Sequence, residues 1–351
     1  MDNRLKRLAE ALYSGCPPIE NRLPPLPEGA FRFFSYGRQA LFAALSLSGV
    51  GKNDTVLLPE YICRDTLSAI HALGAKVSYY PVGEALECSV AEEALPQAKA
   101  IVAVNYFGFP QDLSVFQAYC ERTGAVLVED NAHGFLSRDQ EGRLLGTRGD
   151  IGLFSFRKSV PLINGSGMLI NNPEKLGEIP CQIPFVDYPV PSMFKLKKLL
   201  RRLPRFGMTG LLYGLVRFDR KIRVVRTGAE FVKSGAEAER VLPGSPEPDS
   251  RFLRALESLD DRCEAARRRT LFLAIKDAVE QMGGTPLFPD LPEHVVPYGF
   301  PFRAAGDTVP AIRKTLERCY IDFHPWPELP TEIDGNASEA YKSVHLVNFL
   351  W

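Results

Sequence analysis

The chain has 351 residues, of which 45% are hydrophobic and 24% charged, with 42 basic and 42 acidic side chains. This length is enough for a large hydrophobic core and for more than one domain. The balanced charge argues against a general nucleic-acid binder, which would be basic overall. No apolar stretch approaches the roughly 20 residues that a membrane-spanning helix needs.

The first 30 residues are expected to form an N-terminal helix and, over 17–30, a proline-rich arm. From 31 to 190, short apolar runs alternate with helical patterns. This alternation predicts a large, doubly wound α/β domain with a mostly parallel sheet. The predicted strands are 55–58, 76–80, 100–105, 125–129, 152–156 and 167–170. The predicted helices are 39–47, 63–73, 90–98 and 114–122.

The second half of the chain differs from the first in its charge pattern and in the elements that it predicts. Residues 191–248 are expected to be a basic, helical connecting segment, since 195–226 holds eleven Lys or Arg and a single acid. Residues 249–351 are expected to form a smaller α+β domain. It would begin with one charged helix over 250–283 and contain another over 308–319.

The seven cysteines bear on the compartment. They are Cys16, Cys63, Cys88, Cys120, Cys181, Cys263 and Cys319. They are odd in number and form no C-x-x-C pair, which is typical of reduced thiols with neither a disulfide framework nor a metal site. We therefore expect a cytoplasmic protein without a bound metal.

Polar residues follow the predicted strands at the sheet edge where ligands of such folds bind. Gly37 lies where an apolar segment breaks and a helix begins, so free backbone N–H groups there suit a phosphate. Asp130 ends one buried strand and His133 follows it in the loop. Ser155 ends another strand, with Lys158 three residues further on. Taken singly, each is more often a turn, a cap or a solvated strand end.

Their combination indicates one cofactor. Pyridoxal phosphate (PLP) needs a phosphate cup, a carboxylate for its ring nitrogen, a donor to its ring oxygen and a lysine for its aldehyde. A lysine partly withdrawn from water has a pKa below its usual value of about 10.4, and as a neutral amine it can form a Schiff base. Lys158 is the candidate for this role.

Four ordered stretches carry a resemblance that extends over most of the chain and is strongest from Gly37 to Met168. They are YGRQALFAALSLSGVGKNDTVLLPEYIC, AIVAVNYFG, VLVEDNAHGF and GTRGDIGLFSFRK. Together they resemble the DegT/StrS family of sugar aminotransferases. The resemblance implies an aspartate-aminotransferase-like fold, fold-type I of the PLP enzymes, with a large PLP-binding domain and a smaller C-terminal one.

The resemblance also implies roles for single residues. Lys158 would be the Schiff-base lysine, and Asp130 would pair with the pyridine nitrogen. His133 stands where a Gln or His contacts the ring. Ser155 would bind the phosphate together with the backbone at Gly37 and its neighbour.

The chain departs from the family in several places. Arg38 replaces a phosphate-binding Thr, although its guanidinium can also pair with phosphate. Cys63 stands where an aromatic ring often stacks on the cofactor, and Tyr61 is the alternative for this contact. The spacing between serine and lysine is shortened, and the turn at 164–167 reads Asn-Gly-Ser-Gly in place of Gly-Glu-Gly-Gly.

The resemblance implies transfer of an amino group from glutamate to a keto group of a nucleotide-linked sugar, by a homodimer with shared active sites. The balanced charge predicts no nucleic-acid partner. The basic stretch 195–226 has three open interpretations: a solvated cationic face, attraction to the nucleotide-sugar diphosphate, or peripheral contact with an anionic membrane. Two alternatives remain for the function. One is a PLP-dependent sugar dehydratase, in whose relatives a His replaces the lysine, and the other is a catalytically decayed scaffold or sensor.

Overall fold

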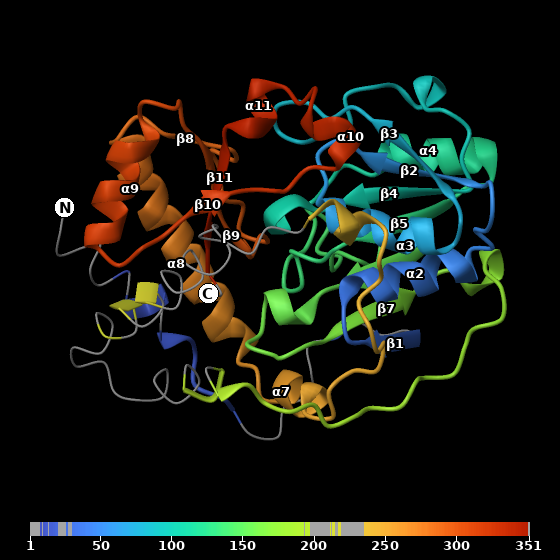
Figure 1. Cartoon of the computed structure of the whole chain (residues 1–351), viewed down its shortest axis with the longest axis horizontal. Helices are drawn as coiled ribbons and strands as arrows, with labels where there is room; N and C mark the ends of the chain where they lie inside the picture. Colours follow the sequence, from blue (N-terminus) through green and yellow to red (C-terminus); the bar gives the residue numbers. More distant parts are fainter. Residues whose placement is uncertain are drawn as a thin grey trace.

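The computed structural model describes residues 8, 10–12, 14–19, 26, 30–192, 194–196, 211, 213–214, 217–218 and 235–349. The expected N-terminal helix and arm lie largely outside these residues, and so does most of the basic stretch 195–226. Figure 1 shows a large sheet with its helices and, beside it, a smaller unit formed by the C-terminal part of the chain.

Seven strands form the large sheet, in the order β1-β7-β6-β5-β4-β2-β3. The strands β2 to β6 run parallel to one another. At one edge, β7 pairs antiparallel with β6, and β1 pairs antiparallel with β7. Their bounds are Ala30–Phe34 (β1), Thr55–Pro59 (β2), Lys76–Tyr80 (β3), Ala100–Val104 (β4), Val126–Asp130 (β5), Ile151–Phe154 (β6) and Ser166–Ile170 (β7). All six predicted strands are confirmed to within two residues. The strand β1 was not predicted.

The helices of this domain are α2 (Gly37–Leu47), α3 (Leu67–Ala72) and α4 (Ser114–Thr123). Short 3₁₀ turns complete it: η1 (Arg64–Thr66), η2 (Glu92–Ala94), η3 (Tyr106–Gly108), η4 (Phe156–Lys158) and η5 (Pro173–Lys175). The prediction of a helix over 90–98 was wrong, because only η2 forms there. Leu95 precedes a proline and is extended (φ −71°, ψ 129°), a conformation that the proline ring favours and that ends the turn.

The C-terminal part is built on a four-stranded antiparallel sheet in the order β10-β11-β9-β8. Its strands are β8 (Thr285–Pro286), β9 (Gly299–Arg303), β10 (His324–Pro325) and β11 (Val344–Asn348). The helical elements are η6 (Ala236–Glu239), α7 (Phe252–Glu257), α8 (Asp261–Glu280), α9 (Val309–Arg318), α10 (Thr331–Asp334) and α11 (Glu339–Lys342). The single helix predicted over 250–283 is therefore two. It breaks at Asp260, whose extended backbone lets its side chain cap α8 by accepting from the N–H of Cys263.

Aromatic side chains pack α7 against η4, the turn that ends at Lys158. The ring of Phe252 lies 5.3 Å from that of Phe156, the first residue of η4. The 164–167 turn is shaped by this packing. Gly165 has φ +140°, and a Cβ there would come within 2.6 Å of the Phe252 ring. Gly165 stands where the family motif has Glu, so the departure of this turn from the motif places a glycine where the packing requires one.

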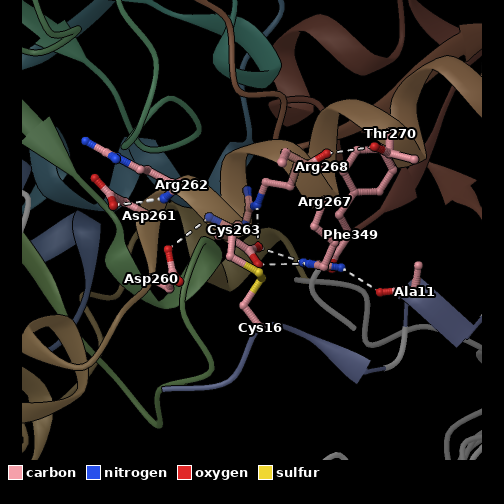
Figure 2. Close-up of a disulfide and its surroundings, with 12 residues drawn as sticks. Ala11, Cys16, Asp260, Asp261, Arg262, Cys263, Arg267, Arg268, Thr270 and Phe349 are labelled. Atoms are coloured by element: carbon pink, nitrogen blue, oxygen red, sulfur yellow. Dashed lines mark hydrogen bonds and ion pairs between the residues drawn. A yellow bond between two sulfur atoms is a disulfide. The ribbon is translucent and has the colours of Figure 1, made fainter. Parts of the chain in front are cut away.

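The expectation that every cysteine is a free thiol was wrong. Cys16 and Cys263 form a disulfide that joins the N-terminal segment to the first turn of α8 (Figure 2). The two residues are 247 positions apart, so only the tertiary structure brings them together. Near the bond, Arg267 of α8 donates to the carbonyl oxygen of Ala11 at 3.2 Å. Within the described residues, no helix is long and apolar enough to cross a membrane.

Candidate active site

A small cavity lies at the carboxyl ends of β4, β5 and β6, where the sequence predicts the ligand site. Its lining is Ile62, Cys63, Thr66, Val104, Asn105, Tyr106, Asp130, Ala132, His133, Lys158 and Trp326. All of these residues come from the large sheet and its loops except Trp326, which follows β10 of the small sheet. The cavity therefore forms where the two parts of the chain meet.

Lys158 is the last residue of η4, the turn that follows β6, and its N–H donates to the carbonyl oxygen of Ser155 at 2.9 Å. Its Nζ lies 3.1 Å from Nε2 of His133. Burial lowers the pKa of Lys158 below its usual value, although the nearby Cys63 and Asp130 oppose this. The lysine is thus a half-buried amine biased toward its neutral form.

Asp130 is the last residue of β5, and its Oδ1 accepts a hydrogen bond from the N–H of Ala132 at 2.9 Å. Burial raises the pKa of this carboxyl, and the charge of Lys158 acts in the opposite direction. Within the described part of the chain, no cation forms an ion pair with it. A half-buried carboxylate with so few partners is suited to a bound group that carries an N–H.

His133 is held between two aromatic rings. The Tyr298 ring stacks on it at 4.5 Å with an interplanar angle of 3°, and the Phe107 ring lies 5.7 Å away at 18°. Its Nδ1 accepts from the main-chain N–H of Phe107 at 3.3 Å. Burial, and then the charge of Lys158, hold the pKa of His133 well below its ordinary value. The imidazole is therefore neutral and presents Nε2 to the lysine.

The predicted phosphate residues gather at the start of α2. A Cβ placed on Gly37 would lie 3.9 Å from the Cβ of Ser155, so these two residues face each other. The first N–H groups of a helix lack intrahelical acceptors and are available to an anion. Arg38 lies beside them, but its Nη1 is 3.5 Å from Oδ2 of Asp65. The other carboxylate oxygen of Asp65 is buried without a hydrogen-bond partner.

A loop distant in sequence supports this cup. Gln39 donates from Nε2 to the carbonyl oxygens of Pro243 and Gly244, at 3.0 and 2.7 Å. The N–H of Ser35 donates to the carbonyl oxygen of Pro246 at 2.8 Å. The loop 243–246 thus fixes the junction between β1 and α2, which sequence reasoning missed.

The two candidates for contact with the cofactor ring are placed differently. Cys63 lines the cavity, and burial raises the pKa of its thiol to about 11, so it is a small neutral group. Tyr61 does not line it: its hydroxyl donates to the carbonyl oxygen of Trp326, and its ring lies 5.6 Å from the Trp326 ring. Trp326, which was not singled out from the sequence, is the aromatic wall that the small sheet contributes.

The donor set fits the cofactor that the sequence predicts. Lys158 supplies a half-buried amine for an aldehyde, and Asp130 a half-buried carboxylate for a ring nitrogen. His133 supplies a neutral imidazole. Ser155 and the first amides of α2 supply the hydroxyl and N–H groups that a phosphate needs.

The amino-acid sequence is similar to known proteins over part of its length. A sequence model of the DegT/DnrJ/EryC1/StrS aminotransferase family matches residues 34–183. A curated relative, L-glutamine:2-deoxy-scyllo-inosose aminotransferase of Streptoalloteichus tenebrarius, is 33% identical over 37% of this chain. That match spans about a third (32%) of the relative's length.

Two solved structures illustrate the fold. The aminotransferase TlmJ from Streptoalloteichus hindustanus aligns with 99% of this chain and 84% of its own, at 20% identity and a TM-score of 0.61. GDP-4-keto-6-deoxymannose-3-dehydratase with a trapped PLP-glutamate geminal diamine aligns with 91% of this chain and 83% of its own, at 16% identity and a TM-score of 0.56.

These likenesses confirm the predicted fold-type I architecture. The matched residues, 34–183, contain the whole set formed by Gly37, Asp130, His133, Ser155 and Lys158. This part of the chain is similar to the DegT/DnrJ/EryC1/StrS aminotransferase family, whose members depend on PLP.

Proposed function

We propose that the protein is a PLP-dependent aminotransferase that transfers an amino group from glutamate to a keto group of a nucleotide-linked sugar. One observation carries the proposal: Lys158, Asp130 and His133 line a single cavity within the part of the chain that matches the family. Burial biases the amine toward the neutral, nucleophilic form that covalent binding of an aldehyde requires.

Each residue then has a defined task. Lys158 would hold the cofactor through Nζ, Asp130 would face the ring nitrogen, and Ser155 with the start of α2 would hold the phosphate. When bound, PLP supplies an electron sink for a carbanion at the substrate carbon. The neutral Nζ of Lys158 can accept a proton as a general base and return it as a general acid. His133 holds that nitrogen in place by a contact of 3.1 Å.

The dehydratase remains the alternative within this fold, since one protein of similar structure is a dehydratase. Lys158 favours transamination, because the resemblance places a His at this position in dehydratases. The two reactions differ in their products: transamination yields an amino sugar and an oxo acid, whereas dehydration removes a hydroxyl group as water. Identification of the sugar product by mass spectrometry separates them.

The setting of the enzyme is part of the proposal. We place it in the cytoplasm as a homodimer with shared active sites, acting on a nucleotide-sugar and an amino-acid donor. Disulfides are rare in reducing compartments, so there the bond between Cys16 and Cys263 would form only on oxidation. Mass spectrometry of protein alkylated at the moment of cell lysis would show whether these two thiols are free.

The test of the function begins with the colour of the purified protein. Incubation with PLP should give a visible absorbance band, and borohydride should fix the cofactor on the peptide that contains residue 158. Addition of glutamate should convert the band to that of the amine form, and a screen of nucleotide-ketosugars should then restore it. A colourless protein with no trapped adduct would contradict the proposal and favour the decayed scaffold.

A further inference from the structure

The turn η3, Tyr106–Gly108, contains a strained residue beside the cavity. Phe107 has φ +55° and ψ 14°, the left-handed region that bulky side chains rarely adopt. Such a conformation is unfavourable and persists only where the surroundings impose it. Here the N–H of Tyr298 imposes it by donating to the carbonyl oxygen of Phe107 at 2.7 Å.

The strained backbone points a donor at His133. The main-chain N–H of Phe107 donates to Nδ1 of the imidazole at 3.3 Å. A ring nitrogen that accepts a hydrogen bond carries no proton, and a neutral imidazole has one proton to place. That proton is therefore on Nε2. The stacked rings of Tyr298 and Phe107 hold the imidazole plane in this position.

The tautomer has a consequence for the lysine. Nε2 of His133 lies 3.1 Å from Nζ of Lys158. An N–H on Nε2 can be donated only to a lone pair, and the lysine nitrogen has a lone pair only as a neutral amine. An ammonium group would instead set one N–H against another. The contact at 3.1 Å is thus favourable for the neutral lysine and unfavourable for the charged one.

We propose that Phe107 is a positioning residue whose main-chain N–H fixes His133 as the Nε2–H tautomer, which in turn holds Lys158 as a neutral amine. The inference deepens the proposed function and rests on it for its purpose, because a neutral amine is what attack on an aldehyde needs. Burial of the lysine acts in the same direction.

A second buried histidine, His345, provides an internal control for the tautomer of His133. His345 is also buried, with 8% of its surface exposed, and burial lowers its pKa as well. Its Nδ1 lies 2.8 Å from the carbonyl oxygen of Ser343. A carbonyl can only accept, so Nδ1 of His345 carries the proton. The two buried histidines should therefore be opposite tautomers.

Nitrogen NMR of the full chain labelled with ¹⁵N-histidine, without cofactor or substrate, tests this directly. We expect the proton on Nε2 in His133 and on Nδ1 in His345, with His133→Gln and His345→Gln assigning the signals. A proton on Nδ1 of His133, or an imidazolium at neutral pH, would overturn the proposal. Because no cofactor is present, this result does not depend on whether the protein is an aminotransferase.

Two variants separate the amide from the ring of Phe107. In Phe107→Gly the N–H remains and the positive φ becomes permissive, so the Nε2–H tautomer should persist. Loss of the tautomer there would assign its control to the stacked ring and overturn the role of the amide. In Gly108→Ala a Cβ would lie 2.7 Å from the carbonyl oxygen of Val296, at φ +94°, so the turn must move and the tautomers should mix.

The His345 signals report whether Gly108→Ala is folded. A folded Gly108→Ala variant that keeps the wild-type tautomer would contradict the proposal. If this variant does not fold, Phe107→Gly still decides between the amide and the ring.

Discussion

Two groups of charged residues withdrawn from water in this molecule have opposite arrangements. On α8, the Glu264 carboxylate accepts from Nη2 of Arg267 at 2.6 Å and from Nε of Arg268 at 2.7 Å. Burial alone would raise the pKa of Glu264, but the two arginines lower it to about 2. In the candidate site, Lys158 and Asp130 are half-buried, and desolvation prevails there and shifts the pKa of each toward the neutral form.

This difference in pKa shifts distinguishes charged residues that stabilise the fold from charged residues available for catalysis. A buried ion pair is tolerated when its hydrogen bonds are complete, whereas shifted groups with few partners in a cavity are candidates for catalysis. The two groups are also connected. Arg268 donates from Nη2 to the carbonyl oxygen of Ser159 at 2.8 Å, one residue after Lys158. Figure 2 shows Arg267 and Arg268 beside Cys263, so the same helix carries the disulfide.

The largest effect should come from Lys158→Ala, with opposite consequences for activity and stability. The variant should form no borohydride-stable adduct, and kcat for amino transfer should fall by about 10³-fold or more, since positioned proton transfer alone contributes roughly 10²–10⁴. Its thermal stability without cofactor should equal or exceed that of the wild type, because an amine whose charged form is disfavoured by desolvation has been removed. Kinetics and a melting curve on the same preparation check both. A strongly destabilised variant would place the lysine among the structural charges.

The next largest effect should come from Glu264→Gln. It leaves the buried guanidinium of Arg268 without its anion, which should cost about 3–5 kcal/mol in the free energy of unfolding, measured with urea. Glu280→Gln on the same helix is the matched control. Its partner Lys276 is 3.9 Å away and the carboxylate is 45% exposed, so about 0–1 kcal/mol is expected.

The pH dependence of this stabilisation has a definite sign. The pKa of Glu264 is depressed in the folded chain, so its contribution is present above its usual value near 4.5 and is lost as the pH falls toward about 2. The stability gap between wild type and Glu264→Gln should therefore narrow over this interval. A gap independent of pH would show that the carboxylate charge is not the cause.

A smaller effect is expected from the disulfide. Cys16→Ser should lower the free energy of unfolding by about 2–4 kcal/mol, because the bond restricts the unfolded chain over a long loop. Reductant should have the same effect on the wild type and none on the variant. Cys181→Ser, which removes an exposed free thiol, should change nothing. Equal melting temperatures for wild type and Cys16→Ser would show that the N-terminal segment is not part of the structure that unfolds in the main transition.

Sequence reasoning identified the parts of the molecule whose signals are local. Strands that are apolar on both faces, such as β4 and β5, are visible as continuous runs, and Asp130 and Lys158 stand at the strand ends that the pattern marks. The missed features depend on contacts distant in the chain. Trp326 and Tyr298 reach the site from the small sheet, and the 243–246 loop supports α2. Neither the disulfide nor the left-handed backbone of Phe107 has a signature in spacing or composition.

The smallest effect is expected at Asp130, a charged residue of the site that should destabilise the folded, cofactor-free protein. Burial raises the pKa of Asp130 in the folded chain, so the folded state favours its protonated form. The stabilising contribution of the carboxyl is then present below its usual pKa near 3.8 and is lost as the pH rises. At neutral pH, Asp130→Asn should slightly raise the free energy of unfolding of the cofactor-free protein.

This gain should vanish below about pH 4, where the wild-type carboxyl is itself protonated. Asp139→Asn is the control with the opposite sign. Burial would raise the pKa of Asp139, but hydrogen bonds from Arg143 outweigh it and lower the pKa. Asp139→Asn should therefore destabilise the protein at neutral pH. Melting curves of both variants across a pH series measure the two signs. If Asp130→Asn also destabilises the protein at neutral pH, then Asp130 has a compensating partner in the fold. The proposed division between structural and catalytic charges would then be wrong for Asp130.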